Sequence, residues 1–296
     1  MPELPEVETV VRDLARLVVG RRIVSGRMLR DRNLLHPDPA TFATSIEGRA
    51  VDRVRRRAKW ILVELSGGVV LAVHLRMTGQ ILVVSCDAPL DPYVRARLAL
   101  DDGRELRFRD VRAFGRLALV ARRDDGLPAR TLDPSSGPLL AEQGDEPLEA
   151  SFTVGRLHAL LAPKRGRIKP LLLDQRIVAG IGNIYADEAL WRAKLHPAHP
   201  VDRLTSAQVA RLHAGIVGVL AEAVSARGSS VDDYTAPDGD GEMQERLDVY
   251  QRTGAPCRRC GSALRRTVIG GRGTHYCAKC QRAPKGYSSR GESRSS

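Results

Sequence analysis

The sequence predicts an α+β protein in which an N-terminal helix and a β-rich domain precede a helical domain and a small cysteine-bearing hairpin. Three observations predict this class. Apolar residues recur at helical spacing over residues 4–18, short apolar runs separated by Gly or Asp-Gly turns fill residues 21–121, and helical patterns return from residue 153. At 296 residues the chain is long enough for two domains with separate cores.

The first element is an amphipathic helix that begins within MPELPEVETV and ends before Gly20. Proline is favoured in the first turn of a helix, and acidic residues near its N-terminus interact favourably with the helix dipole. Pro2 and the three glutamates Glu3, Glu6 and Glu8 therefore have a structural explanation. That explanation leaves open whether the end of the chain has a second role.

Seven apolar runs after this helix predict β-strands, with SGG and DDG among the turns between them. The runs are RRIVSGRML, KWILVEL, GVVLAVHL, QILVV, RARLAL, RELRFR and GRLALVA. Their pattern is consistent with a sandwich or with a barrel. Residues 123–150 are rich in Asp, Gly, Pro and Ser, so we assign residues 1–132 to the first domain and 133–150 to a linker.

Helical patterns follow in VGRLHALL, IKPLLLDQ, NIYADEALWRA and TSAQVARLHAGIVGVLAEAVSA. Thr205 or Ser206 is a suitable N-cap for the last of these. We assign residues 151–250 to a helical domain, in which the glycine- and acid-rich residues 228–245 form a loop. The cysteine-bearing module covers residues 251–282, and residues 283–296 form a basic tail that we expect to be disordered.

The cysteines predict one structural zinc ion. Cys257, Cys260, Cys277 and Cys280 give the spacing C-x2-C-x16-C-x2-C, in which each pair supplies one side of a tetrahedral site. The intervening segment, with GGRG at a turn, is typical of a β-hairpin. Four thiolates leave no open coordination position, so a catalytic zinc is excluded. Cys86 stands apart as an ordinary thiol.

The charge distribution indicates a polyanionic partner. The net charge is +12, and residues 251–296 contain eleven Lys or Arg and one acidic residue, Glu292, so ten of the twelve net charges lie there. Nucleic acid is the first expectation for such a basic module, although zinc ribbons are also common in proteins that only bind. No apolar run is long enough to span a membrane and no secretory signal is evident, so we expect a cytoplasmic, nucleoid-associated protein without a membrane partner.

Six ordered stretches together resemble bacterial formamidopyrimidine-DNA glycosylase, the base-excision enzyme for oxidised purines. They are MPELPEVETV, HLRMTGQ, DVRAFG, LLLDQRIVAGIGNIYADEAL, VYQRTGAPCRRCG and GRGTHYCAKCQ. The resemblance covers residues 2 to about 282. It implies an N-terminal helix plus β-sandwich, a helix–two-turn–helix domain whose loop near 228–245 caps the lesion, and a zinc finger. It also implies a monomer that binds double-stranded DNA containing oxidised bases or abasic sites, with one structural Zn²⁺ and no organic cofactor.

The resemblance assigns catalytic roles near the start of the chain. Met1 is removed, and the secondary amine of Pro2 attacks C1′ of the damaged nucleotide to form an iminium, after which β,δ-elimination nicks the strand. An α-amino group is less basic than a lysine amine, so more of it is neutral and nucleophilic at pH 7. Glu3 matches the general acid, Glu6 a second acidic position, and Lys59 a lysine that contacts the phosphate beside the lesion.

The resemblance also assigns DNA-binding roles. Met77, Arg112 and Phe114 match the side chains that fill the stack when the nucleotide is flipped out, because apolar wedges separate bases and Arg can donate to the orphaned base. Asn183, behind two glycines at a helix start, matches a phosphate contact, as do His74 and Arg272. Without the resemblance, Met77 and Phe114 would be interpreted as core residues, His74 as a satisfied buried histidine and Lys59 as a solvated charge.

Three departures from the family pattern make base preference less certain than reaction type. Ala113 replaces a basic residue that is common between Arg112 and Phe114, Asp232 lies where relatives often have Lys or Arg, and QGDEPL replaces LGPEPL. We therefore keep two alternatives. One is an endonuclease VIII-like glycosylase for oxidised pyrimidines, against which the set Met77, Arg112 and Phe114 argues. The other is a non-catalytic zinc-ribbon DNA-binding protein, against which Pro2, Glu3 and Lys59 argue.

Overall fold

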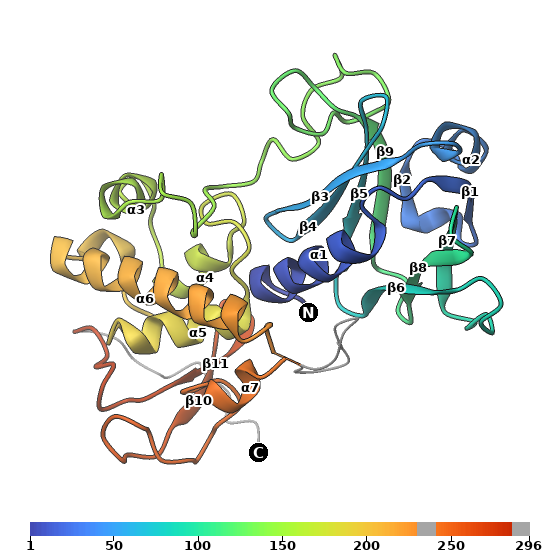
Figure 1. Ribbon diagram of the computed structural model, residues 1–296. Coiled ribbons are helices and arrows are strands. Elements are labelled where there is room, and N and C mark those ends of the chain that lie inside the picture. The colour runs from blue at the N-terminus through green and yellow to red at the C-terminus, as the bar shows by residue number, and fades with distance from the viewer. Residues whose placement is uncertain (230–240, 286–296) are drawn as a thin grey trace. The chain divides into compact units, whose positions relative to one another are not determined.

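The computed structural model describes residues 1–229 and 241–285 (Figure 1). The chain forms two compact units, each of which is described by itself. The first contains Met1–Ala141 together with Arg227–Glu242, of which 227–229 and 241–242 are described. The second contains Glu142–Ala226 and Met243–Ser296, described as far as residue 285. The predicted α+β class is confirmed.

The first unit is a β-sandwich, which resolves the choice between sandwich and barrel. One sheet has five strands in the order β2-β9-β5-β4-β3, and the other has four in the order β1-β7-β8-β6. The strands are β1 (Ile23–Met28), β2 (Leu34–His36), β3 (Val51–Arg57), β4 (Trp60–Leu65), β5 (Val69–His74), β6 (Gly79–Ser85), β7 (Val94–Leu100), β8 (Arg104–Asp110) and β9 (Arg116–Ala121). All pairs are antiparallel except β2 with β9.

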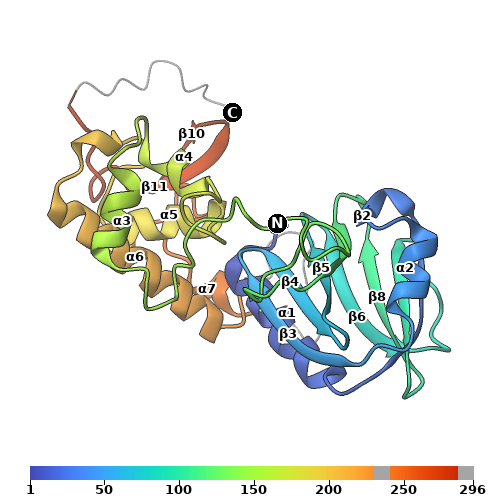
Figure 2. The same cartoon turned by 90° about the horizontal axis from the view of Figure 1, so that it is seen from above.

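Helix α1 (Leu4–Val18) closes one side of the sandwich (Figure 2). It packs along β3 and also touches β4 and β6, so it bridges the edge strands β3 and β6 of the two sheets. Its buried face includes Val7, Val10 and Leu14, which join the core shared by the two sheets. Because the apolar positions face this core, the polar N-terminal turn of α1 is fixed at the rim of the sandwich, near the turns that enter β4 and β6.

The sequence patterns missed three elements of this unit. They are β2, α2 (Pro39–Ile46) and β3, with the 3₁₀ turn η1 (Asp31–Asn33) preceding β2. Apolar and polar residues alternate poorly along β3, because Arg55, Arg56 and Arg57 are consecutive and a bulge follows Val51. Two of its arginines pair with acidic side chains of neighbouring elements: Arg55 with Glu64 on β4, and Arg56, whose Nε donates to Glu8 on α1 at 3.0 Å.

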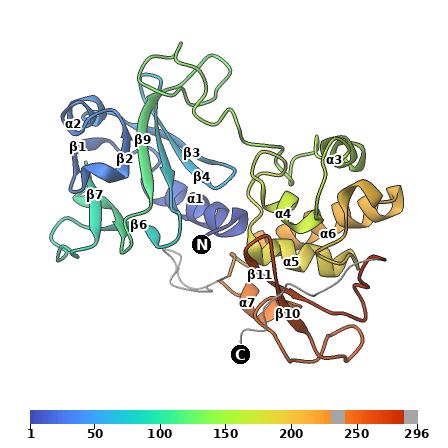
Figure 3. The same cartoon turned by 180° about the vertical axis from the view of Figure 1, so that it is seen from behind.

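The second unit combines a helical layer with a β-hairpin (Figure 3). Its elements are α3 (Val154–Leu161), α4 (Ile168–Leu173), α5 (Asn183–Arg192), η2 (Val201–Arg203), α6 (Ser206–Ser225), α7 (Met243–Arg246), β10 (Arg265–Ile269) and β11 (Arg272–Tyr276). Helix α6 packs closely on α5, since a Cβ at Gly215 would lie 2.6 Å from the Ala189 carbonyl oxygen. Thr205 is its N-cap, and β11 packs against α5.

Among the residues that the structure describes, one helix, α6, is long and apolar enough to cross a membrane by length and composition. The expectation that no run reaches that length was therefore wrong. Seven residues of α6 are buried within the second unit, where the helix packs on α3 and α5. The apolar composition follows from this position, because a central helix of a helical layer is covered on more than one face.

Candidate functional site

The head of α1 places three of the candidate residues together. Glu3 is the N-cap, and Glu3 and Glu6 form a capping box in which the Glu3 backbone N–H donates to Glu6 Oε2 at 2.9 Å. Pro2, Glu3 and Glu6 are buried, whereas Met1 is 40% exposed. Removal of Met1 would therefore leave a buried Pro2 as the chain end, adjacent in sequence to the buried Glu3 at the head of the helix that carries Glu6.

Glu6 also binds a segment that is remote in sequence. Its Oε1 accepts hydrogen bonds from the backbone N–H and the hydroxyl of Ser229 at 2.8 and 3.2 Å. Gly228 precedes with φ +76°, and a Cβ there would lie 2.9 Å from Glu6 Oε1. Only glycine combines this backbone conformation with so close an approach. The carboxylate thus fixes both the helix start and the entry to the segment beyond Ser229.

Lys59 and His74 lie at the strand ends next to this helix. Lys59 is buried in the turn between β3 and β4, and His74 ends β5, where its register partner is Trp60. Ala58, with φ 53°, makes that turn possible, and its carbonyl oxygen accepts from Arg56 Nη1 at 3.0 Å. Arg56 in turn contacts Glu8 of α1, so the turn with Lys59 is tied to the helix.

His74 is neutral at physiological pH. Burial, together with the positive charges of Arg76 and Lys59, lowers its pKa from 6.5 to about 3. Its Nδ1 accepts the Arg76 backbone N–H at 3.0 Å, so the ring proton belongs on Nε2. His74 can consequently donate one hydrogen bond to an anion through Nε2, but it contributes no charge. Lys59 and Arg76 supply the positive field at this end of the sheet.

Two loops at the same rim expose the three candidate insertion residues. Met77 precedes β6, and Arg112 and Phe114 lie between β8 and β9. Met77 and Phe114 are 40% and 45% exposed, although both are apolar. The Arg112 guanidinium carbon lies 4.9 Å from the centre of the Phe114 ring, a cation–π arrangement that orients both side chains. The interpretation of Met77 and Phe114 as core residues is therefore wrong.

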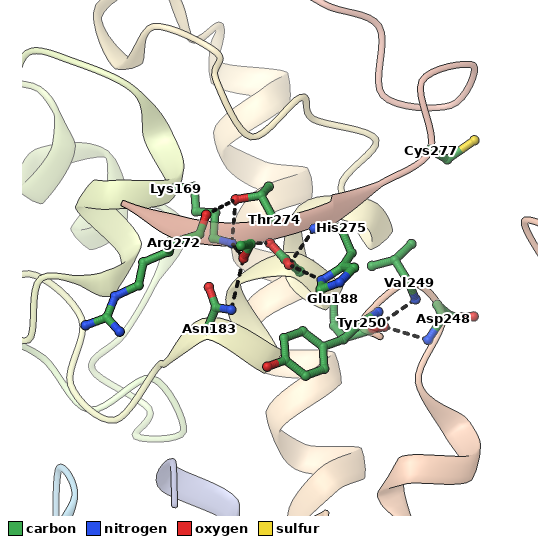
Figure 4. A network of polar contacts seen from close by, with 12 residues as sticks. Lys169, Asn183, Glu188, Asp248, Val249, Tyr250, Arg272, Thr274, His275 and Cys277 are labelled. Carbon is green, nitrogen blue, oxygen red and sulfur yellow. Dashed lines mark hydrogen bonds and ion pairs between the residues drawn. The ribbon is translucent and has the colours of Figure 1, made fainter. Parts of the chain in front are cut away.

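The second unit brings Asn183 close to the hairpin that carries Arg272 (Figure 4). Asn183 is the first residue of α5, behind the N-cap Gly182, and its Nδ2 donates to the Gly273 carbonyl oxygen at 3.0 Å. Gly270 and Gly271 have φ 59° and 74°, which suit a two-residue hairpin turn, and Arg272 is exposed directly after it. A helix N-terminus and a guanidinium therefore lie near each other, an arrangement typical of phosphate sites.

Residues that sequence reasoning missed hold this arrangement in place. Lys169 on α4 is fully buried; its Nζ lies 2.7 Å from Asp187 Oδ1 and donates to the Gly273 carbonyl and the Thr274 hydroxyl at 2.9 Å each (Figure 4). Asp187 Oδ2 accepts the His275 backbone N–H at 2.8 Å. The motifs IKP and NIYADE contain these residues, but only the fold shows that they face each other.

The four predicted zinc ligands are gathered in the hairpin module. The sulfur atoms of Cys257, Cys260, Cys277 and Cys280 all lie within 4.8 Å of one another, and the Cys260–Cys277 pair is 3.5 Å apart. Tetrahedral zinc with bonds of about 2.3 Å places its sulfurs about 3.8 Å apart, so the geometry suits one ion. Hydrogen bonds from Ser262 lower the pKa of Cys260 to about 6, while burial and neighbouring thiols raise the pKa of Cys280 to about 12. Zinc binds cysteines as thiolates, so a bound ion would remove this difference between the pKa values of the four thiols.

The candidate residues thus form separate groups, each within its own unit. Pro2, Glu3, Glu6, Lys59 and His74 surround the head of α1 and adjacent strand ends, and the loops with Met77, Arg112 and Phe114 belong to the same unit. Asn183, Arg272 and the cysteines belong to the second unit. Asp232 and most of the expected capping loop lie outside the described residues.

Comparisons with known proteins agree along the chain. Three family descriptions match: formamidopyrimidine-DNA glycosylase N-terminal domain at residues 1–117, its H2TH domain at 143–235, and the zinc finger found in FPG and IleRS at 254–283. A formamidopyrimidine-DNA glycosylase of Roseiflexus sp. (strain RS-1) is 47% identical over 285 residues, covering 95% of this chain and 100% of the relative.

Solved structures show the same likeness. The Fpg protein of Thermus thermophilus is 42% identical with a TM-score of 0.82, covering 95% of this chain and 98% of that one. A Lactococcus lactis Fpg mutant in complex with DNA containing Fapy-dG is 35% identical with a TM-score of 0.86, covering 95% and 100%.

Proposed function

The chain belongs to the formamidopyrimidine-DNA glycosylase family, and on that premise we propose that it is a bifunctional DNA glycosylase and abasic-site lyase. It excises oxidised purines such as 8-oxoguanine and formamidopyrimidines from double-stranded DNA, and then nicks the strand by β,δ-elimination in base excision repair. The zinc finger is structural. Because the proposed substrate is DNA, we place the protein in the cytoplasm at the nucleoid.

The observation that carries the proposal is the position of the chain end. Pro2 is buried beside Glu3 and Glu6, at the rim where Lys59 and His74 also lie, while Met1 is exposed. An exposed Met followed by a small residue is accessible to removal. The resulting secondary amine then stands next to a proton donor, and cations at the adjacent strand ends favour its neutral form.

The proposed chemistry uses these groups in sequence. The Pro2 nitrogen attacks C1′, the bond from C1′ to the base breaks, and the base leaves with the proton that the Pro2 amine gives up on bonding to C1′. Glu3 protonates the ring oxygen as the sugar opens, giving an iminium at C1′. The iminium acidifies the C2′ proton, whose loss expels the 3′ phosphate; a second elimination expels the 5′ phosphate. Lys59 and His74 hold a phosphate of the strand, by charge and by an N–H donor respectively.

The remaining candidate residues bind DNA and fill the space left by the flipped nucleotide. Met77 and Phe114 enter the stack vacated by the flipped nucleotide, and Arg112 donates to the base left without a partner. Asn183 and Arg272 bind phosphates in the second unit. The comparisons favour this function over both alternatives, because the relatives are named formamidopyrimidine-DNA glycosylases and the solved neighbours include complexes with lesion-bearing DNA.

Reductive trapping tests the proposal. The protein is incubated with duplexes carrying 8-oxoguanine, a formamidopyrimidine or an oxidised pyrimidine, and borohydride is added to capture the imine. We expect a covalent adduct with the purine lesions, and peptide mapping should place it on the N-terminal peptide. An adduct on Lys59, or equal trapping by a form that retains Met1, would contradict the role of Pro2. Preferential trapping with the pyrimidine lesion would favour the endonuclease VIII-like alternative.

A further inference from the structure

Asp110, at the end of β8, connects the two loops that expose Met77, Arg112 and Phe114. Its carboxylate is fully buried. Oδ1 accepts the hydroxyl of Thr78 at 2.5 Å, and Oδ2 accepts the backbone N–H of Gly115 at 2.7 Å. One carboxylate therefore binds the residue after Met77 and the residue after Phe114.

The Thr78 hydroxyl completes the connection. While it donates to Asp110, it accepts the backbone N–H of Arg112 at 3.1 Å. Strand register makes this possible, because β6 and β8 pair with Gly79 opposite Asp110. The Met77 loop and the Arg112 loop are therefore joined directly by hydrogen bonds through Thr78 and Asp110.

The bases of both loops are held, while their tips are exposed. Arg95 Nε donates to the Asp110 carbonyl oxygen at 2.8 Å, and Asn33 Nδ2 donates to that of Gly115 at 2.8 Å. A Cβ at Gly115 would lie 2.4 Å from the Phe108 ring and 3.0 Å from Asp110 Oδ2, so no larger residue suits this position. A Cβ at Gly79 would lie 2.4 Å from the Leu75 carbonyl oxygen.

We infer that Asp110 and Thr78 are positioning residues that make the Met77 loop and the Arg112–Phe114 loop enter DNA as one rigid unit. The inference rests on the proposed function of those loops and assigns to Asp110 and Thr78 no contact with DNA. Their effect is to fix the spacing between two wedges and one hydrogen-bond donor before DNA binds, which removes the cost of ordering two separate loops.

The test compares variants of Thr78 in the full-length protein. Thr78→Val preserves the shape of the side chain and removes the hydroxyl, Thr78→Ser retains the hydroxyl, and Asp110→Asn removes one acceptor. The matched control is Thr41→Val, which removes a hydroxyl that donates to Asp38 at 2.6 Å elsewhere in the same unit. The two Thr→Val variants lose the same kind of bond, so a difference between them reports on the loops.

Two substrates distinguish a loss of loop positioning from general damage to the protein. One is a duplex with an 8-oxoguanine, from which the nucleotide must be flipped. The other is a single strand with a preformed abasic site, in which no stack needs filling. We expect Thr78→Val to slow single-turnover excision from the duplex by about 10- to 100-fold and to change imine trapping on the single strand by less than about two-fold. Asp110→Asn should act in the same direction, Thr78→Ser should restore duplex excision, and Thr41→Val should leave both reactions unchanged.

A double-mutant cycle gives a second readout. Met77→Ala and Phe114→Ala should be non-additive for duplex excision in the unaltered protein and additive in the Thr78→Val background. The inference is overturned if Thr78→Val behaves like Thr41→Val, if it reduces both substrates equally, or if the cycle is already additive in the unaltered protein. Failure of the proposed function is distinguishable, because the unaltered protein would then form no adduct with abasic DNA.

Discussion

Ser229 donates its backbone N–H to Glu6 Oε1 at 2.8 Å, although the two residues lie 223 positions apart in the sequence. The same carboxylate accepts the Glu3 N–H through its other oxygen. The head of α1 and Ser229, at the start of the expected capping loop, are therefore held by one side chain. In this family member, the conformation around Pro2 and the start of that loop are coupled through Glu6.

Gly228→Ala should weaken this coupling. The left-handed φ of +76° costs an alanine about 1–2 kcal/mol, and the new Cβ would press on Glu6. We expect lower thermal stability and slower excision of 8-oxoguanine, with a smaller effect on cleavage of a preformed abasic site, where no base needs covering. Differential scanning calorimetry and single-turnover assays provide the measurements.

Gly218→Ala is the matched control for that substitution. Gly218 lies on the exposed face of α6, where a Cβ would come no closer than 3.9 Å to Arg192. Alanine is favoured over glycine within a helix by about 0.5–1 kcal/mol, so this variant should be slightly more stable and fully active. If both alanine variants had the same activity, the contact between Gly228 and Glu6 would have no role in excision.

The salt dependence of DNA binding should distinguish Lys59 from His74. Affinity for a duplex with an abasic-site analogue is measured by fluorescence anisotropy between about 50 and 200 mM salt. Lys59→Ala should reduce the slope of log affinity against log salt by about one, because one charge is lost. His74→Ala should lower affinity without changing the slope, since its pKa of about 3 keeps the ring neutral.

His74 should also leave the pH profile of binding unchanged. The ring stays neutral from pH 5 to 8 in the folded protein, so the ratio of affinities between the unaltered protein and His74→Ala is expected to be constant over that range. A ratio that rises below pH 6.5 would show that His74 binds DNA as a cation.

Cys260→Ser should release zinc and abolish DNA affinity while the β-sandwich unit persists. Zinc contributes about 10–16 kcal/mol to small modules of this kind, far more than the hairpin can gain from its own core. Metal content, anisotropy and limited proteolysis are the measurements. Cys86→Ser is the control, because Cys86 lies outside the four-cysteine cluster. Unchanged affinity of a zinc-free protein for lesion-bearing DNA would contradict the prediction.

Glu188 should make stability depend on pH. It is buried on α5, and its carboxylate accepts backbone N–H groups of Asp248, Val249 and Tyr250 at 2.8–2.9 Å. Burial nevertheless raises its pKa from 4.5 to about 7. The folded protein thus retains a proton that the unfolded chain releases above pH 4.5. The stabilising contribution is complete below pH 4.5 and is lost as pH rises through 7, by about 3 kcal/mol in total.

Urea unfolding at several pH values tests this sign. The difference in unfolding free energy between the unaltered protein and Glu188→Gln should decrease from pH 4.5 to 7, because glutamine does not titrate. Glu149→Gln, at an exposed position in the same unit, should give a constant difference. Parallel curves for Glu188→Gln and the unaltered protein would show that the carboxyl ionises normally in the fold.

The sequence by itself determined most elements and the zinc site. Apolar spacing predicted α1, α3, α4, α5 and α6, because apolar residues recur every three to four positions in a helix that buries one face. The spacing of Cys257, Cys260, Cys277 and Cys280 predicted their cluster, since two C-x2-C pairs suit only a few geometries. The candidate catalytic and DNA-binding residues came from ordered motifs that resemble a family, and their chemistry could be stated at once.

Only the tertiary structure decided which remote groups meet. The strand runs were compatible with a sandwich or a barrel. Strand β3 was hidden by three consecutive arginines, of which Arg55 and Arg56 pair with Glu64 on β4 and Glu8 on α1. The pairs Glu6 with Ser229, Asp110 with Thr78 and Lys169 with Asp187 join residues that lie 223, 32 and 18 positions apart. Local periodicity carries no information about such pairs. Each pair forms only because the packing of whole sheets and helices brings a buried carboxylate next to its partner.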